Sequence, residues 1–167
     1  MLKRIFLLSL LAFSTVAFAQ ATATYKNTAA RFQMSYPKAW TARENVMGTT
    51  VFVAKLNPQG FSTNVNVIVQ TVPKGTTLKA MSGALEQQLS SVITDFKLLS
   101  QKNSTLGGQP ALVLSYTGRQ GKYALTWDQS IVIRGTSNYI VTFTAETAVY
   151  KRERAPLPAI LSSFKFL

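Results

Sequence analysis

The sequence has 167 residues, with 18 Lys and Arg against 6 Asp and Glu and a formal net charge of +12. It contains no His and no Cys, which excludes disulfides and any catalytic triad or metal site that needs an imidazole or a thiolate. Its length is enough for one domain with its own hydrophobic core, and these features together favour a binding or accessory protein over an enzyme.

The N-terminal residues have the pattern of an export signal. Two basic residues precede an apolar run over 5–17, and Ala17-Phe18-Ala19 has the small-x-small pattern of a cleavage site. The run is about thirteen residues long, whereas a membrane-spanning helix needs roughly 20. We therefore expect a removable signal peptide over 1–19 and a single domain over 20–167. We expect the product in the periplasm or outside the cell, and not as an integral membrane protein.

The first strands are predicted before residue 72. A small polar leader over 20–29 precedes a segment at 32–36 in which apolar and polar residues alternate, as in a half-buried strand, and Pro37 ends it. A second strand is predicted over 49–56. The clearest strand covers 64–71, with three valines on one face and polar side chains on the other.

One long amphipathic helix is predicted over 78–92. Thr76 or Thr77 can cap it, because a hydroxyl accepts hydrogen bonds from the free amides of the first turn. The residues expected on its apolar face are Leu78, Met81, Leu85, Leu89 and Val92. We expect this face to pack on a sheet.

The rest of the chain is predicted to form antiparallel strands and a short terminal helix. Strands over 96–106 and 111–117 pair across a Gly-Gly turn, and a long strand over 123–134 turns into another at 139–145. Pro156 suits the first turn of the closing helix. Its apolar residues are Leu157, Ile160, Leu161 and Phe164. Strands grouped with a central and a terminal helix indicate an α+β domain.

The positive charge has two interpretations. Without Lys3 and Arg4 the expected mature chain carries 16 basic and 6 acidic side chains, a net +10. An anionic lipid surface, a cell-wall polymer, a nucleic acid or an acidic protein face would match this charge. A high isoelectric point also keeps a small domain soluble with no specific partner. The only basic cluster is Lys151-Arg152-Glu153-Arg154. Nucleic acid is disfavoured, because the aromatic residues occupy inward strand positions without interleaved cations.

Catalytic patterns are missing. Ser35-Tyr36-Pro37-Lys38 matches S-x-x-K, but that motif needs its Ser and Lys one turn apart on a helix, and Pro37 follows a strand pattern here. None of the six carboxylates lies in a calcium-loop pattern. Asp128 and Glu146 lie on predicted strands, where they either meet across a sheet face or each pair with a nearby cation. We expect no catalytic residue, no cofactor and no metal site.

Two elements are predicted to face a partner. Phe61 lies in a connecting segment over 57–63 bounded by Pro and Gly, where a large aromatic side chain needs a pocket or a partner. The basic residues Lys151, Arg152 and Arg154 form the second element. The alternatives are that Phe61 folds back over the sheet edge and that the basic run is only a solvated approach to a helix.

The order of motifs resembles the PsbP-like family, including its DcrB-type bacterial members, over residues 32–164. The matching motifs are Phe32-Gln33-Met34-Ser35-Tyr36-Pro37 with Trp40, Phe61 with Asn64-Val65-Asn66-Val67, Gly107-Gly108-Gln109-Pro110-Ala111 with Leu114-Ser115-Tyr116, Tyr139-Ile140-Val141-Thr142-Phe143-Thr144-Ala145 with Tyr150, and Ile160-Leu161-Ser162-Ser163-Phe164.

The resemblance implies a central antiparallel sheet between helices, an α/β/α sandwich, and a non-catalytic role. Photosynthetic members assist the oxygen-evolving side of photosystem II and help it retain calcium and chloride. This chain departs from the plant members in its short segment before Phe32 and in having no His, so a His-based metal site is not carried over.

We therefore expect a monomeric, exported, non-catalytic accessory protein that docks on an envelope or membrane-associated partner. A photosystem II role applies only in a photosynthetic source. The alternative is a polyanion- or small-ligand-binding envelope protein that uses its basic surface.

Overall fold

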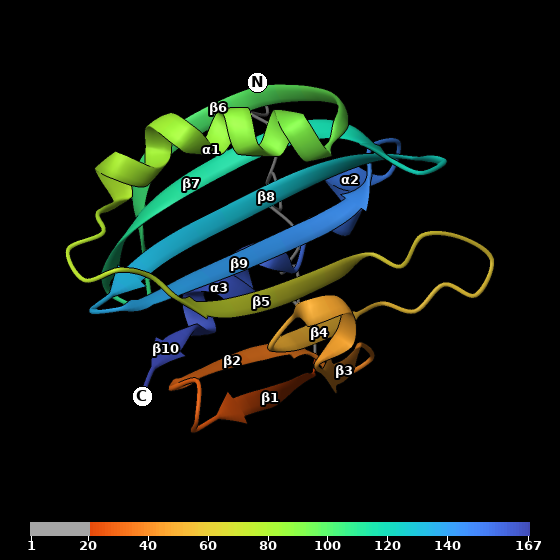
Figure 1. Cartoon of the computed structure of the whole chain (residues 1–167). Coiled ribbons are helices and arrows are strands. Elements are labelled where there is room, and N and C mark those ends of the chain that lie inside the picture. The colour runs from red at the N-terminus through yellow and green to blue at the C-terminus, as the bar shows by residue number, and fades with distance from the viewer. Residues whose placement is uncertain (1–20) are drawn as a thin grey trace, which may run out of the picture.

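The computed structural model describes residues 21–167, so the predicted signal peptide over 1–19 lies outside the described residues. The chain forms two antiparallel sheets (Figure 1). A seven-stranded sheet has the strand order β3-β4-β5-β9-β8-β7-β6, and a three-stranded sheet has the order β1-β2-β10. The strands are β1 (Thr22–Asn27), β2 (Phe32–Pro37), β3 (Thr41–Glu44), β4 (Val51–Ala54), β5 (Asn64–Thr71), β6 (Thr94–Leu106), β7 (Gln109–Gln120), β8 (Tyr123–Arg134), β9 (Ser137–Glu146) and β10 (Lys165–Phe166). The helices are η1 (Val46–Gly48), α1 (Leu78–Val92), α2 (Tyr150–Glu153) and α3 (Leu157–Ser163).

The antiparallel α+β architecture is confirmed, and several predicted elements have the observed bounds. β2, β5, β8 and α1 coincide with their predictions, whereas β6, β7 and β9 are longer and β4 is shorter. The sequence did not indicate β1, β3, β10 or α2, which are short or lie at a sheet edge. Because β1 pairs along the whole of β2, the predicted polar leader is in fact an edge strand.

The helix α1 begins as predicted, with the Thr77 hydroxyl accepting a hydrogen bond from the amide of Ala80 at 3.2 Å. Leu85 is buried and Leu89 is half-buried in the cluster beneath the helix. The prediction for Val92 is wrong, because this side chain is 79% exposed. The backbone leaves helical geometry at Ile93, and Ile93 packs against the cluster in its place.

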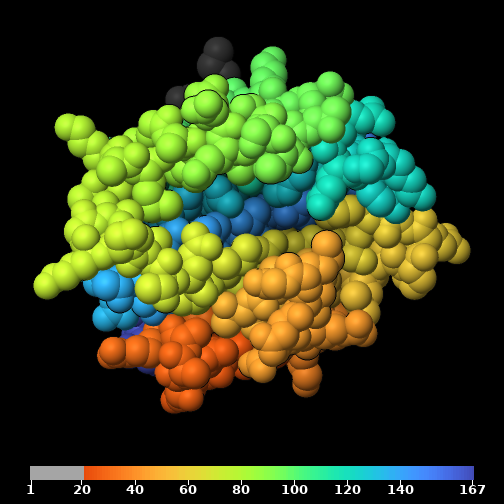
Figure 2. Space-filling view, in the orientation of Figure 1, coloured from red at the N-terminus to blue at the C-terminus, as the bar shows by residue number. Residues whose placement is uncertain are grey.

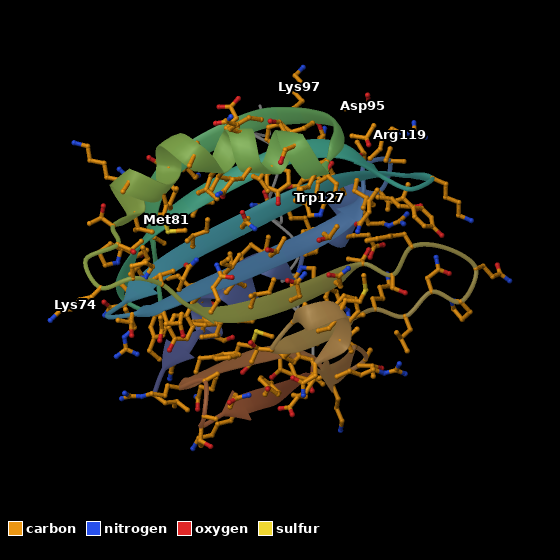
Figure 3. The ribbon with its side chains drawn as sticks, viewed as in Figure 1. Lys74, Met81, Asp95, Lys97, Arg119 and Trp127 are labelled. Atoms are coloured by element: carbon orange, nitrogen blue, oxygen red, sulfur yellow. The ribbon has the colours of Figure 1, made fainter. Side chains whose placement is uncertain are left out.

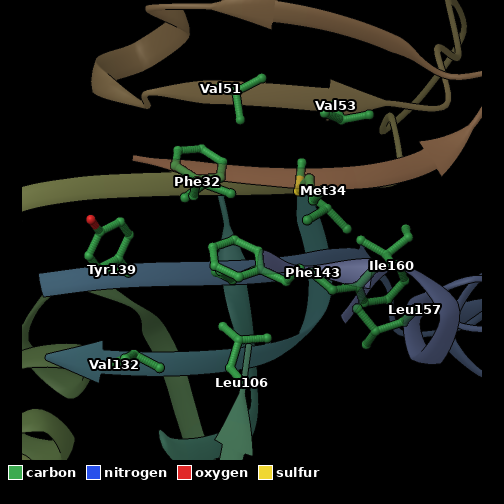
Figure 4. Close-up of a cluster of buried hydrophobic side chains, with 14 of the residues drawn as sticks. Phe32, Met34, Val51, Val53, Leu106, Val132, Tyr139, Phe143, Leu157 and Ile160 are labelled. Atoms are coloured by element: carbon green, nitrogen blue, oxygen red, sulfur yellow. The ribbon is translucent and has the colours of Figure 1, made fainter. Parts of the chain in front are cut away.

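The main core lies between the two sheets (Figure 4). Phe32 of β2 stacks on Phe164 with ring centroids 5.3 Å apart, and Phe143 of β9 is fully buried beneath them. Trp40, which lies between β2 and β3, is also buried in this core. The three-stranded sheet and the short helices α2 and α3 together cover this face. Helical cover is therefore limited, and an α/β/α sandwich describes the fold only roughly.

The opposite face of the seven-stranded sheet is covered unevenly. α1 packs against β6, β7 and β8, and its Met81 points toward the sheet while Lys74 and Lys97 extend into solvent (Figure 3). Figure 2 shows a hollow between α1 and the segment that contains β3, η1 and β4, with β8 and β9 at its floor. Within residues 21–167, no helix is long and apolar enough to cross a membrane.

Candidate partner-binding site

The loop between β4 and β5 is held by its own hydrogen bonds. The Asn57 amide donates to the Ser62 hydroxyl at 2.9 Å, and the Asn57 side-chain oxygen accepts from the Gln59 amide at 3.2 Å. At the base of the loop, the Lys55 amide donates to the Thr63 carbonyl at 2.8 Å. These bonds give the 57–63 segment a defined shape and fix the position of its aromatic residue.

Phe61 is half-buried and not fully presented to solvent. Its ring packs edge-on against Tyr123 at the start of β8, with ring centroids 5.5 Å apart. Phe61 also lines two surface cavities. Phe61 thus has a structural contact and an accessible face, and its predicted role toward a partner stays a prediction.

Arg152 of the basic run forms an ion pair with a buried carboxylate, that of Glu153. Glu153 is 8% exposed and accepts from Lys55 Nζ at 2.9 and 3.1 Å and from Arg152 Nε at 3.1 Å. Burial acts to raise the pKa of Glu153, but the hydrogen bonds and charges of Lys55 and Arg152 outweigh it and lower the pKa. The carboxylate joins Lys55, at the base of the loop, to α2 and contacts Arg152.

Arg154, at the end of the basic run, is paired with a different carboxylate, that of Asp128. Arg154 Nε and the Tyr150 hydroxyl both donate to Asp128 Oδ2 at 2.6 Å. Burial and then the Asp128 carboxylate raise the pKa of Tyr150, and the hydrogen bond to Asp128 raises the pKa of Arg154. Lys151 makes no ion pair with any residue that the structure describes.

The register of β8 and β9 separates the two strand carboxylates. Asp128 lies opposite Phe143 and Glu146 lies opposite Leu125, so the two carboxylates project from different faces of the sheet. Asp128 pairs with Arg154 as the second alternative expects, whereas Glu146 forms no ion pair with any residue that the structure describes. Within residues 21–167, no three acidic side chains gather as a metal-binding group. Ser35 lies on β2, where its hydroxyl is 3.2 Å from that of Thr24.

The two predicted partner-facing elements meet at one cavity. This cavity has a volume of about 410 Å³, and Phe61 and Arg152 both line it together with Lys55. Leu56, next to it, is 54% exposed. We call Lys55, Leu56, Phe61 and Arg152 the loop-end surface, whereas Lys151 and Arg154 of the predicted basic element do not line the cavity. No sequence pattern singles out Lys55 or Leu56, because their place at the cavity depends on α2 folding against the loop.

Comparison with known proteins agrees with this architecture. A family model described as PsbP-like protein matches residues 12–166. The chain belongs to the PsbP-like family. No curated protein matches the sequence. The fold is similar to that of the cyanobacterial PsbP protein CyanoP from Synechocystis sp. PCC 6803, with a TM-score of 0.67 and 15% identity over 93% of this chain and 98% of that one.

Two further solved bacterial structures share the fold. LpqN of Mycobacterium tuberculosis, described as involved in cell envelope biogenesis, has a TM-score of 0.66 and 12% identity over 80% of this chain and 82% of that one. A Pseudomonas aeruginosa protein of unknown function, described as a putative regulator, has a TM-score of 0.58 and 14% identity over 82% of this chain and 91% of that one. At these identities the likeness concerns the fold alone.

Proposed function

We propose that this PsbP-like protein is an exported, non-catalytic accessory protein that docks on an envelope or membrane-associated partner through the loop-end surface. The observation that carries the proposal is that Phe61 and Arg152, 91 residues apart in the chain, line one cavity of about 410 Å³. Aromatic residues and Arg are enriched at the centres of protein interfaces, where they contribute most of the binding energy.

The loop-end surface is pre-organised, which lowers the entropic cost of binding. Glu153 fixes Lys55 and Arg152, and the hydrogen bonds of Asn57 fix the loop that carries Phe61. The exposed side chain of Leu56 adds apolar area beside these cations. An acidic partner face with an apolar centre would match this surface. We propose that the protein docks on this partner as a monomer.

The test is quantitative co-purification from an envelope extract with wild type, Phe61→Ala and the triple variant Lys151/Arg152/Arg154→Ala. We expect both variants to lose most of the partner while they keep the wild-type circular dichroism spectrum. Because Arg154 is paired with Asp128, the single variant Arg154→Ala separates a folding effect from a binding effect. A Lys165→Ala variant, changed on β10, is the matched control for lost charge.

The proposal is wrong if folded Phe61→Ala and the folded triple variant recover the same partners in wild-type amounts. Export is tested separately by intact-mass measurement of the protein in the periplasmic or secreted fraction. We expect a chain that starts at Gln20 after loss of residues 1–19, and full-length protein retained in the membrane would contradict the export proposal.

A second candidate function is binding of a polyanion through the whole basic surface. The observation in its favour is that, among the described residues, only Lys55, Arg152 and Arg154 form ion pairs and no Lys or Arg is buried, so most of the positive charge faces solvent. Binding to vesicles with anionic lipids would then weaken steeply and continuously as salt is added, because contacts to polyanions release counterions. Docking through the loop-end surface would depend less steeply on salt, because its apolar contacts at Phe61 and Leu56 are not screened.

A further inference from the structure

We propose that the half of the seven-stranded sheet left open by α1 is a second binding site, and that it takes an uncharged, extended peptide segment with one bulky apolar side chain. This site lies on β4, β5, β8 and β9, and we call it the sheet groove. It goes beyond docking by the loop-end surface, with which it shares one lining residue, Phe61.

The register of the strands builds the floor of the sheet groove. Asn66 lies opposite Phe52 on β4 and opposite Thr142 on β9, and Thr142 lies opposite Gln129 on β8. The adjacent row places Asn64, Thr144 and Trp127 side by side. Strand alternation therefore brings carboxamides and hydroxyls from three strands onto one face. Figure 3 labels Trp127 on β8 near the end of α1.

These residues surround a cavity of about 320 Å³, which corresponds to the hollow seen in Figure 2. This volume is at the lower end of small-ligand sites, which span roughly 300–1,000 Å³. It is enough for a short length of peptide with one large side chain and too small for a folded domain. The lining residues are Met47, Thr49, Phe52, Phe61, Ser62, Asn64, Asn66, Ile68, Tyr116, Gln120, Trp127, Thr142 and Thr144.

The polar floor has hydrogen-bonding capacity left over. Gln129 does not line the cavity, but it donates through Nε2 to the Thr142 hydroxyl of the floor at 3.2 Å, while its Oε1 is buried without a partner among the described residues. Asn66 donates to Asn64 only at a long 3.4 Å. Such groups cost stability when they face an apolar core, and native structures satisfy nearly all of them. Carboxamides both donate and accept, which matches the alternating N–H and C=O groups of a peptide backbone.

The rim of the sheet groove presents an apolar side chain at an energetic cost. Met47 is 85% exposed and has a φ of 50°, in the left-handed region that a non-glycine residue rarely adopts. Asn45, just before it, has a φ of 56°. Backbone strain of this kind concentrates at ligand-binding segments. A flexible thioether is also suited to closing over apolar side chains of varied shape.

The absence of charged residues around the sheet groove indicates which ligand it takes. None of the lining residues is charged, although the mature chain would carry a large positive excess. A charged ligand would lose its hydration there without gaining an ionic partner, so an uncharged segment is favoured. Tyr116 and Trp127 stack on each other at 5.3 Å and are 3% and 7% exposed, so neither offers an open ring face to a sugar or a base.

The test titrates the ¹⁵N-labelled 20–167 chain with capped heptapeptides of Ser, Thr and Gly that carry one central Leu. Side-chain amide signals of Asn64, Asn66 and Gln120, which all line the sheet groove, report binding there. We expect these signals to shift, and we expect peptides with central Ser, Lys or Glu to bind at least about tenfold more weakly, because they lack the apolar anchor.

Variants of the floor and the rim sharpen this test. We expect Asn66→Leu to weaken peptide binding about tenfold while Asn103→Leu, on the exposed edge strand β6, leaves it unchanged. Met47→Gly should weaken binding and at the same time raise the unfolding midpoint, because glycine adopts this φ without strain. A purely structural role for Met47 would not separate these two effects.

Several outcomes overturn the proposal. It is wrong if no capped peptide shifts the three carboxamide signals at millimolar concentration, or if peptides with central Lys or Glu bind as well as the Leu peptide. It is also wrong if maltotriose or chitotriose shifts these signals and the peptides do not. The triple variant Lys151/Arg152/Arg154→Ala should bind the Leu peptide normally, so loss of docking and loss of peptide binding are separate results.

Discussion

The two faces formed by strands β5 and β9 differ sharply in composition, although alternate residues of the same two strands supply both. Toward the three-stranded sheet, β5 and β9 present Val65, Val67 and Phe143, each 0% exposed within the main core. Toward the sheet groove they present Asn64, Asn66 and Thr142. One face therefore supplies the burial that stabilises the fold, which leaves the other face free to carry polar groups that a core would not tolerate.

The largest contrast is expected between neighbouring residues of β9. Phe143→Ala should lower the free energy of unfolding by about 3–5 kcal/mol, because it removes a fully buried ring and leaves a cavity. Thr142→Ala should cost about 1 kcal/mol, through loss of the hydrogen bond from Gln129. Urea unfolding of both variants measures the difference. Similar losses at the two positions would show that the groove face also belongs to the core.

The region under α1 should show an intermediate contrast. Leu85→Ala should cost about 2–3 kcal/mol, because Leu85 is only 8% exposed, and half-buried Leu89→Ala should cost less. Glu86→Ala, on the solvent side, should change stability by less than about 0.5 kcal/mol. Val92→Ser should be equally small because Val92 is exposed. Thermal unfolding of the four variants would contradict the observed helix phase if Glu86→Ala matched Leu85→Ala.

Sequence periodicity predicted α1, β5 and β8 because each carries a long, regular pattern of apolar residues. It failed at Val92, because the pattern continues by one residue past the point where the backbone turns and Ile93 takes over the packing. It also missed β1, whose short polar sequence becomes a strand only by pairing with β2. Local patterns carry no information on such tertiary effects.

For the candidate site, the sequence singled out Phe61 and the basic run but gave no sign that Phe61 and Arg152 share a cavity. The link is the ion pair between Lys55 and Glu153, which are 98 residues apart. The sheet groove was missed for a similar reason. Whether Asn66 faces a core or a hollow depends on where α1 lies across the sheet, and no residue near Asn66 encodes that position.

A substitution at Gly118 tests how closely the end of α1 is packed against β7. A Cβ at this position would lie within clashing distance of the Ile93 side chain and 2.9 Å from the Thr94 carbonyl. Gly118→Ala should therefore cost about 1–3 kcal/mol, because crowding a packed contact forces the backbone to shift. Gly83→Ala, in the exposed part of α1 with open space around it, should instead stabilise by up to about 1 kcal/mol. Equal shifts of the unfolding midpoint at these two glycines would contradict the packing at Ile93.

The smallest expected effect concerns acid stability at the loop-end surface. Lys55 and Arg152 lower the pKa of Glu153 in the folded protein below its ordinary value of 4.5. The ionised carboxylate therefore contributes stability above that ordinary value, and this contribution is lost as the pH falls through the lowered folded pKa. Glu153→Gln should lower the free energy of unfolding modestly at pH 7 and make stability less dependent on pH below 5.

Glu86→Gln, changed on an exposed carboxylate of α1, is the matched control and should leave the acid profile as in wild type. Urea midpoints between pH 2.5 and 7 measure both profiles, and parallel profiles for wild type and Glu153→Gln would show that the carboxylate does not anchor α2 to the loop.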